Sequence, residues 1–207
     1  MSARRFLVVA LAGGVAAAAV LSGCASSASP PGASVTTSPP AGPSAQVAEV
    51  NPPGDIPDSQ AFVVYTAPDR SYSVKYPEGW AQTTRGADVV FSDKFNSITV
   101  APHNGFYQPT EDYAHTVEVP QIAAATTGFA PGQVGTEQRP AGAVVVITYQ
   151  GDSAPSPVTG KSIRQDFARY EFSRGGRGVV ITLAAPTGSD TVDPWRIVTD
   201  SFTWLHG

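Results

Sequence analysis

Residues 72–80 have the sequence Tyr72-Ser73-Val74-Lys75-Tyr76-Pro77-Glu78-Gly79-Trp80. Large apolar side chains alternate with small or charged ones over the first five positions, which is the pattern of a strand with one buried face. The Pro-Glu-Gly sequence that follows is typical of a turn and ends the strand. An apolar, β-branched run at 62–66 lies before it, beyond turn residues at 68–70, so we expect residues 62–76 to form a β-hairpin.

Strand patterns also dominate the chain after residue 80. Six further stretches alternate or are continuously apolar, at 87–91, 98–101, 134–138, 143–149, 162–173 and 179–185. The run Val144-Val145-Val146-Ile147 is apolar on both faces, so we expect that strand at the centre of the sheet. Gly175-Gly176, between the last two stretches, is a strong hairpin signal.

Two segments have helical periodicity instead. The first begins after Thr110, whose side chain can cap the helix, and Pro120 is expected to kink or split it near Val119. The second closes the chain, with Asp193 as the expected N-cap and Pro194 at the first helical position. Together these patterns predict an α+β domain, with an antiparallel sheet of about six or seven strands covered by helices.

Two of these segments resemble a known superfamily. Residues 72–80 resemble the aromatic strand and Tyr-Pro-x-Gly-Trp motif that open the PsbP-like superfamily, to which the Mog proteins belong. Residues 193–202 are similar to its last helix, and the resemblance extends over about residues 60–205. It implies a domain of αβα layers and mostly non-enzymatic work, in which a compact domain offers a surface to another macromolecule.

The N-terminus has the features of a bacterial lipoprotein signal. Two arginines precede an uncharged run at 6–21, which has the length of a signal-peptide core and is short for a membrane span. Leu21-Ser22-Gly23-Cys24 then resembles the lipobox, and no other cysteine is available to form an internal disulfide. We expect cleavage after Gly23, acylation of Cys24 and attachment to the outer face of the cell membrane.

The composition changes after this signal. Residues 1–23 are the expected signal peptide, 24–59 the lipidated cysteine with a disordered tether rich in Pro, Ser and Ala, and 60–207 the globular domain. The whole arrangement resembles the Lpq-type lipoproteins of actinobacteria. Removing the signal takes away two arginines and no acid, so the formal net charge changes from −4 to −6, a poor match to nucleic acid. The expected partners are the lipid bilayer, through Cys24, and an unknown envelope protein.

No motif for chemistry satisfies its structural context. Gly160-Lys161-Ser162 lacks the earlier glycine of a phosphate-binding loop and precedes a strand. Glu111 and His115 have the i, i+4 spacing of two metal ligands, but no third ligand is identifiable, so we expect no metal and no cofactor. The sequence also lacks a Gly-x-Ser-x-Gly elbow. We therefore expect no catalytic residues, while a pair of carboxylates brought together only by folding stays an alternative.

One loop is a candidate binding surface. Residues 102–109 join a strand to the first helix and include His103, Phe106 and Tyr107, and loops on a rigid scaffold commonly carry function. The alternative is that Phe106 and Tyr107 only pack the start of the helix onto the sheet. The expected function is a non-enzymatic binding or accessory module for an envelope protein complex. The other candidates are a small-ligand or lipid carrier with a groove between sheet and helices, and an envelope hydrolase.

Overall fold

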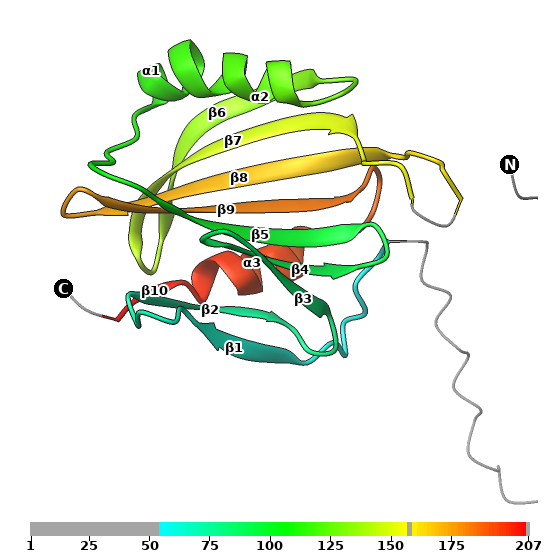
Figure 1. Ribbon diagram of the computed structural model, residues 1–207, viewed down its shortest axis with the longest axis horizontal. Helices are drawn as coiled ribbons and strands as arrows, with labels where there is room; N and C mark the ends of the chain where they lie inside the picture. The colour runs from blue at the N-terminus through cyan, green and yellow to red at the C-terminus, as the bar shows by residue number, and fades with distance from the viewer. Residues whose placement is uncertain (1–53, 157–158, 206–207) are drawn as a thin grey trace, which may run out of the picture. The chain divides into compact units, whose positions relative to one another are not determined.

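The structure is a computed structural model that describes residues 54–156 and 159–205 (Figure 1). These residues belong to one compact unit. The expected signal peptide, the cleavage position after Gly23, the acylated Cys24 and most of the tether lie outside the described residues. No helix within the described part of the chain combines the length and the apolar composition needed to cross a bilayer.

A seven-stranded sheet forms the middle of the molecule. Its strands lie in the order β3-β4-β5-β9-β8-β7-β6, and every neighbouring pair is antiparallel. The strands are β3 (Ala81–Arg85), β4 (Asp88–Asp93), β5 (Asn96–His103), β6 (Ala130–Arg139), β7 (Gly142–Asp152), β8 (Arg164–Arg174) and β9 (Arg177–Pro186). The predicted α+β class with an antiparallel sheet is therefore confirmed.

A second, smaller sheet was not expected. It contains β1 (Phe62–Thr66), β2 (Tyr72–Pro77) and the short β10 (Thr203–Trp204), in the order β1-β2-β10. The predicted hairpin is confirmed as β1 and β2, which pair from Phe62 opposite Pro77 to Thr66 opposite Ser73. It lies in this small sheet and not in the large one.

The two faces of the large sheet are covered by different elements (Figure 1). One face carries α1 (Glu111–Tyr113), the π-helical segment η1 (Ala114–Glu118) and α2 (Val119–Ala125), which together form one continuous helical stretch. The other face carries α3 (Val192–Asp200) and the small sheet. The main core lies between the large sheet on one side and α3 with the small sheet on the other. The domain therefore has helices on both sides of its main sheet.

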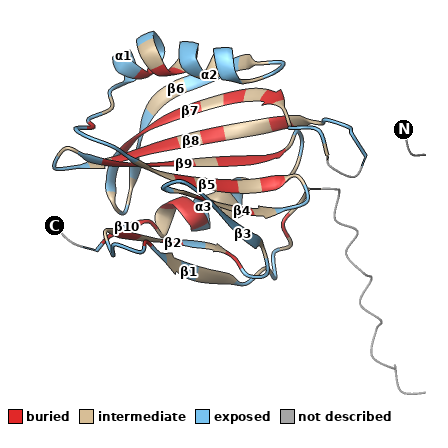
Figure 2. Cartoon of the chain, viewed as in Figure 1, coloured by how far each residue is buried: buried red, intermediate tan, exposed pale blue. Residues whose placement is uncertain are grey.

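The strand β7 is not central, so that expectation was wrong. It lies next to the edge strand β6, whereas β9 occupies the middle of the order. Val144 and Val146 belong to the main core, while Val145 and Ile147 pack under the η1–α2 helix. Figure 2 shows the resulting run of buried positions along β7. Both faces are apolar because both are covered, and this does not require a central position.

The first helix confirms its expected N-cap, and it continues through Pro120 without a break. Thr110 is its N-cap, since the Thr110 hydroxyl accepts a hydrogen bond of 3.1 Å from the backbone N–H of Tyr113. The helix changes from π to α at Val119, one residue before Pro120. Proline has no backbone N–H to donate, so the wider π turn ends where the regular bonding pattern would be interrupted.

The expected N-cap of the last helix was wrong. The helix α3 begins at Val192, and Thr191 occupies the N-cap position without a capping side-chain bond. The Asp193 carboxylate instead accepts a hydrogen bond of 2.9 Å from Arg196 on the next turn. Asp193 still lies in the first turn, where a negative charge stabilises the helix dipole.

The chain contacts the folded domain before residue 60. Residues 54–59 were assigned to the tether, but the Asn96 side chain donates a hydrogen bond of 3.0 Å to the carbonyl of Gly54. The backbone N–H of Asp190 donates to the Asp55 carboxylate at 2.9 Å, and the side chain of Ile56 is buried. The described residues 54–56 therefore contact the domain that was expected to begin at residue 60.

Candidate functional site

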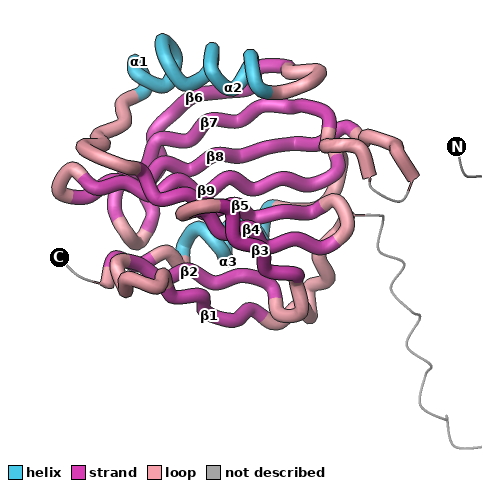
Figure 3. Tube along the Cα trace, in the orientation of Figure 1, coloured by secondary structure: helices cyan, strands magenta, loops and turns pink. Residues whose placement is uncertain are grey.

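The predicted binding loop lies where the large sheet turns its last hairpin. Figure 3 shows this loop in pink between β5 and α1. The backbone N–H of Tyr107 donates a hydrogen bond of 2.8 Å to the carbonyl of Gly176, in the turn that joins β8 to β9. We call this surface the apex and define it by His103, Phe106, Arg174, Gly176 and Arg177.

Tyr107 is an anchor and not part of the exposed surface. Its side chain is buried, and its ring lies against Gly178, where a Cβ atom would overlap the ring. The ring of His103 stacks on it, with the ring centres 4.1 Å apart. The phenol of Tyr107 donates a hydrogen bond of 3.2 Å to Glu118. Of the two interpretations of this loop, packing therefore applies to Tyr107.

Phe106 has the opposite environment. Its side chain is 78% exposed, more than any other large apolar side chain that the structure describes. Its ring lies over Gly176, where an added Cβ atom would lie 2.7 Å from a ring carbon and where the backbone has a φ of +78°. A single exposed apolar side chain is common on soluble proteins. Here Phe106 directly precedes the buried anchor Tyr107, which places its ring over the β8–β9 turn.

Two arginines lie at the ends of the same turn. Arg174 and Arg177 pair across the β8–β9 turn, and both are exposed. The Arg177 guanidinium lies over the ring of Trp204, 5.7 Å from the ring centre. Hydrogen bonds from Ser71 hold the pKa of the nearby Asp69 carboxyl below its usual range, and Arg177 adds to this shift. The apex thus combines an apolar ring with positive charge, in a chain whose formal net charge is −4.

A cluster of buried charges lies beneath Tyr107. Glu171 on β8 is fully buried, Glu118 at the end of η1 is 6% exposed, and Arg169 lies between them. The Nε atom of Arg169 donates to Oε1 of Glu171 at 2.8 Å, and its Nη2 atom donates to Oε1 of Glu118 at 3.2 Å. Each carboxyl has a second oxygen, Oε2, with no hydrogen-bond partner among the described residues.

Burial changes the acid–base behaviour of this cluster. Loss of water raises the pKa of Glu171 to about 8, because a buried carboxylate is destabilised and the neighbouring Glu118 adds to the effect. Burial also raises the pKa of the Tyr107 phenol, and the nearby Glu171 and Glu118 raise it further. Tyr107 is therefore a neutral hydrogen-bond donor over the physiological pH range.

The sequence did not identify Glu118 or Glu171 as special. Along residues 167–173 the charged side chains share one face of the strand with Phe167, a pattern that predicts a half-solvated face. The helix that covers this face comes from a distant part of the chain. The only available signal was a pair of charged residues, Arg169 and Glu171, on the same face of the strand as the apolar Phe167.

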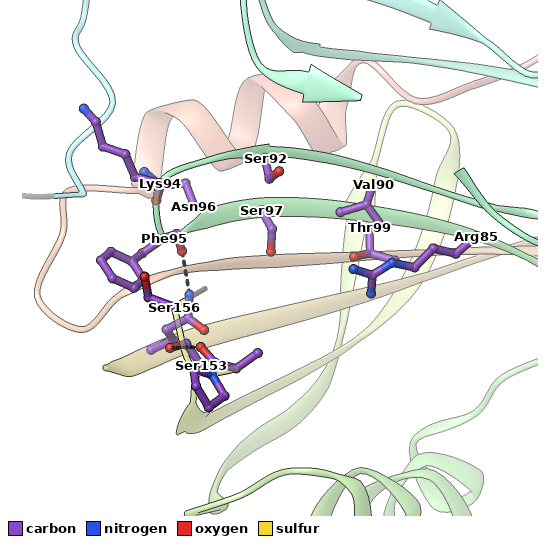
Figure 4. Close-up of a pocket in the computed structure, with 13 residues that line it drawn as sticks. Arg85, Val90, Ser92, Lys94, Phe95, Asn96, Ser97, Thr99, Ser153 and Ser156 are labelled. Atoms are coloured by element: carbon purple, nitrogen blue, oxygen red, sulfur yellow. Dashed lines mark hydrogen bonds between the residues drawn. The ribbon is translucent and has the colours of Figure 1, made fainter. Parts of the chain in front are cut away.

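A second candidate site is a hollow of about 560 Å³ beside strands β4 and β5. Figure 4 shows Ser97 and Thr99 directed toward the loop that follows β7, while the Lys94 side chain extends away from them. Hydroxyl side chains dominate the lining, at Ser92, Ser97, Thr99, Ser153 and Ser156. At one end the Gln165 amide donates to the carbonyl of Phe95. The hollow lies between the sheet and this loop, and not between the sheet and the helices.

Glu111 and His115, whose spacing alone would suit two metal ligands, are arranged for other contacts. The Glu111 carboxylate accepts a hydrogen bond of 2.6 Å from the Thr136 hydroxyl, and His115 is exposed. Within residues 54–156 and 159–205, no three His, Cys, Asp or Glu side chains are grouped as a metal site would require. Gly160 and Lys161 lie in the exposed loop before β8.

Neither a protein-family model nor a curated protein matches the chain. Solved structures are similar to it in fold. The yeast Ran-binding protein Mog1p has 12% identity and a TM-score of 0.47, with 71% of this chain and 97% of Mog1p covered. Cyanobacterial PsbP (CyanoP) from Synechocystis sp. PCC 6803 has 15% identity and a TM-score of 0.47, with 79% and 99% covered.

A protein from Bacteroides thetaiotaomicron is also similar, with 9% identity, a TM-score of 0.46 and 69% of this chain covered. The chain spans about half the length of that protein, 48%.

Proposed function

We propose that this protein is a lipid-anchored envelope lipoprotein whose domain binds a protein partner through the apex. The observation that carries the proposal is Phe106, an exposed ring over Gly176 in the β8–β9 turn, next in sequence to the buried anchor Tyr107, with Arg174 and Arg177 at the two ends of the same turn. Aromatic and arginine side chains are the types that contribute most to protein–protein binding. The matching partner surface is an apolar pocket with acidic residues near it, because the same turn carries two arginines.

The proposed anchor is the acylated Cys24. The support comes from the sequence: a basic start, an uncharged core at 6–21, and a single cysteine directly after Leu21-Ser22-Gly23. Two or more acyl chains give stable attachment without a membrane-spanning helix. The domain then works at the outer face of the cell membrane.

We assign no enzymatic activity to the domain. In the described ranges, His103 stacks on Tyr107 and His115 is exposed, and neither forms a hydrogen bond with a serine or a carboxylate. The carboxyls of Glu118 and Glu171 do come together, but Glu171 is fully buried and both are bound to Arg169. A substrate bond would need to reach both carboxyls, as in a glycosidase, and burial prevents this.

The test is site-specific crosslinking in the intact cell. A photoreactive phenylalanine replaces Phe106 in one variant and Val192 in the control. Val192 is 76% exposed and follows the end of β9 opposite to the apex. We expect one protein to be captured from position 106 and not from 192. The double variant Arg174→Glu, Arg177→Glu should remove this product. In the natural sequence, the partner peptide that is crosslinked at position 106 should lie close to acidic residues of the partner.

Two results would overturn the proposal. One is the same set of products from positions 106 and 192, which would indicate random contact. The other is capture from position 106 that is unchanged when both arginines are reversed, because the partner would then not recognise the charge of the apex.

A second candidate function follows from the hollow at Ser97 and Thr99. A cavity of about 560 Å³ has the size of small-molecule sites, which supports the carrier alternative. Native mass spectrometry of protein purified from its own membrane would detect a bound small molecule. A bound mass that disappears in Ser97→Val with Thr99→Val supports carriage, and unliganded protein contradicts it.

A further inference from the structure

We propose that Glu118 and Glu171 hold one proton between them and form a buried proton-binding site beneath the apex. The proton neutralises the cluster and keeps Tyr107, and with it the apex loop, in place. The first part stands on the geometry of the cluster alone. The second part rests on the proposed function, since it concerns the surface that we assign to partner binding.

The charges of the cluster do not balance without this proton. Arg169 supplies one positive charge, and the carboxyls of Glu118 and Glu171 supply two negative charges if both are ionised. Glu171 is fully buried and Glu118 nearly so. An unpaired charge in such a place is strongly unfavourable, whereas one bound proton leaves the cluster neutral.

The hydrogen bonds lead to the same conclusion. Oε1 of each carboxyl already accepts from Arg169, and the Oε2 atoms of both are buried without a partner. Two carboxylates cannot bond to each other, because neither has a donor. A protonated carboxyl has one O–H group, which would donate to the other carboxyl and satisfy both remaining oxygens.

The other elements around Glu171 bring no compensating charge. On the sheet, Val145 of β7 and Val180 of β9 lie directly opposite it. The helix supplies Glu118, and also Glu111, a further acid that lines the same hollow as Glu171. The apex loop supplies Tyr107, a neutral donor. His103 stacks on Tyr107. Arg169 is therefore the only cation bonded to either carboxyl among the residues that the structure describes.

Tyr107 connects the proton to the apex. Its phenol donates to the same Glu118 oxygen that accepts from Arg169, and its backbone N–H holds Gly176 in the hairpin turn. Loss of the proton would place two repelling carboxylates side by side. Glu118 is the member bonded to Tyr107, and it ends a π-helical segment, a feature often found at functional sites. Movement of Glu118 would weaken the hold on Tyr107.

The first test counts the proton directly. The full chain with ¹³C-labelled glutamate carboxyls is titrated by NMR from pH 4 to pH 10. We expect one step above pH 7 that disappears in Glu171→Gln and also in Glu118→Gln, which guards against a misfolded single variant. Asp112→Asn, an exposed acid on the same helix, should leave the step unchanged. Titration of every glutamate below pH 6 would overturn the proposal.

The second test measures the coupling to the apex. The protection of the Tyr107 amide against hydrogen exchange is compared at pH 6.5 and pH 9.5, after correction for the intrinsic exchange rate. We expect protection to fall at least tenfold in the natural sequence and less than threefold in Glu171→Gln. Equal falls would overturn the coupling. No partner is needed in either test, so their outcomes are independent of the crosslinking result.

Discussion

The phenol of Tyr107 donates a hydrogen bond of 3.2 Å to the carboxylate of Glu118, eleven residues further along the chain. This one bond joins the candidate binding loop to the π-helical segment and, through Arg169, to strand β8. The exposed Phe106 and the buried acids are therefore parts of one connected arrangement.

Tyr107→Phe should lower the free energy of unfolding by about 1 kcal/mol, because it removes the donor to a buried carboxylate. Urea denaturation measures this change. Tyr113→Phe is the control, since Tyr113 is partly exposed on α1 and its hydroxyl forms no hydrogen bond within the described ranges. An equal loss in both variants would show that the Glu118 bond does not contribute.

Gly178→Ala should destabilise the domain by about 1–3 kcal/mol, because its Cβ atom would overlap the ring of Tyr107. Gly135→Ala on β6 is the control, with no atom near the position of the added Cβ and an expected change within about 0.5 kcal/mol. Thermal unfolding compares the two variants. A stable Gly178→Ala variant would mean that the ring of Tyr107 is not fixed in this position.

Phe106→Ala should leave the stability unchanged within about 0.5 kcal/mol, because the side chain is exposed. The same variant should lose the partner that is captured at the apex, which can be measured with a photoreactive group at Asn104. Val192→Ala provides the comparison, as an equally exposed apolar side chain elsewhere. Unchanged capture in Phe106→Ala would remove this ring from the proposed interface.

The stability should fall as the pH rises from about 5 to about 8. The pKa of Glu171 is raised from 4.5 to about 8 in the folded state, so the folded protein holds a proton that the unfolded chain releases. The slope is at most about 1.4 kcal/mol per pH unit, and it ends above pH 8. Urea denaturation across this range should give a flatter profile for Glu171→Gln.

Asp112→Asn is the control for this pH profile, because Asp112 is an exposed acid on α1. Its profile should match that of the natural sequence. A profile that is equally steep in Glu171→Gln would assign the slope to other groups.

Cys24→Ala should abolish incorporation of labelled fatty acid and release the protein from the membrane fraction. Ser26→Ala, two residues later, should leave both unchanged because it preserves the sequence around the cleavage position. Labelling that persists in Cys24→Ala would contradict the proposed anchor.

Local signals in the sequence predicted several elements closely. The apolar run at 62–66 became β1 with those bounds, and Gly175-Gly176 formed the β8–β9 turn with positive φ at both positions. These features depend on neighbouring residues, since a turn needs glycine where φ is positive. Thr110 capped its helix for the same local reason.

Other features depended on distant parts of the chain. The strand β3 was missed because all five of its side chains are exposed, so no alternation marks it. Glu171 is buried only because a helix some fifty residues away covers its face of the sheet, and the short-range pattern carries no trace of that cover. The predicted central position of β7 was wrong for the same reason. An apolar strand is buried wherever both of its faces are covered, and this does not depend on its place in the order of the sheet.

The place where the chain enters the fold has a geometric consequence. A Cβ atom at Gly54 would lie 2.5 Å from the ring of Pro186, the last residue of β9, and Arg177 begins that strand at the other end. A strand of ten residues is about 33 Å long. A force applied to the chain at Gly54 would therefore act on the Pro186 end of β9. The apex, with Phe106, lies at the Arg177 end of the same strand and stays accessible to a partner.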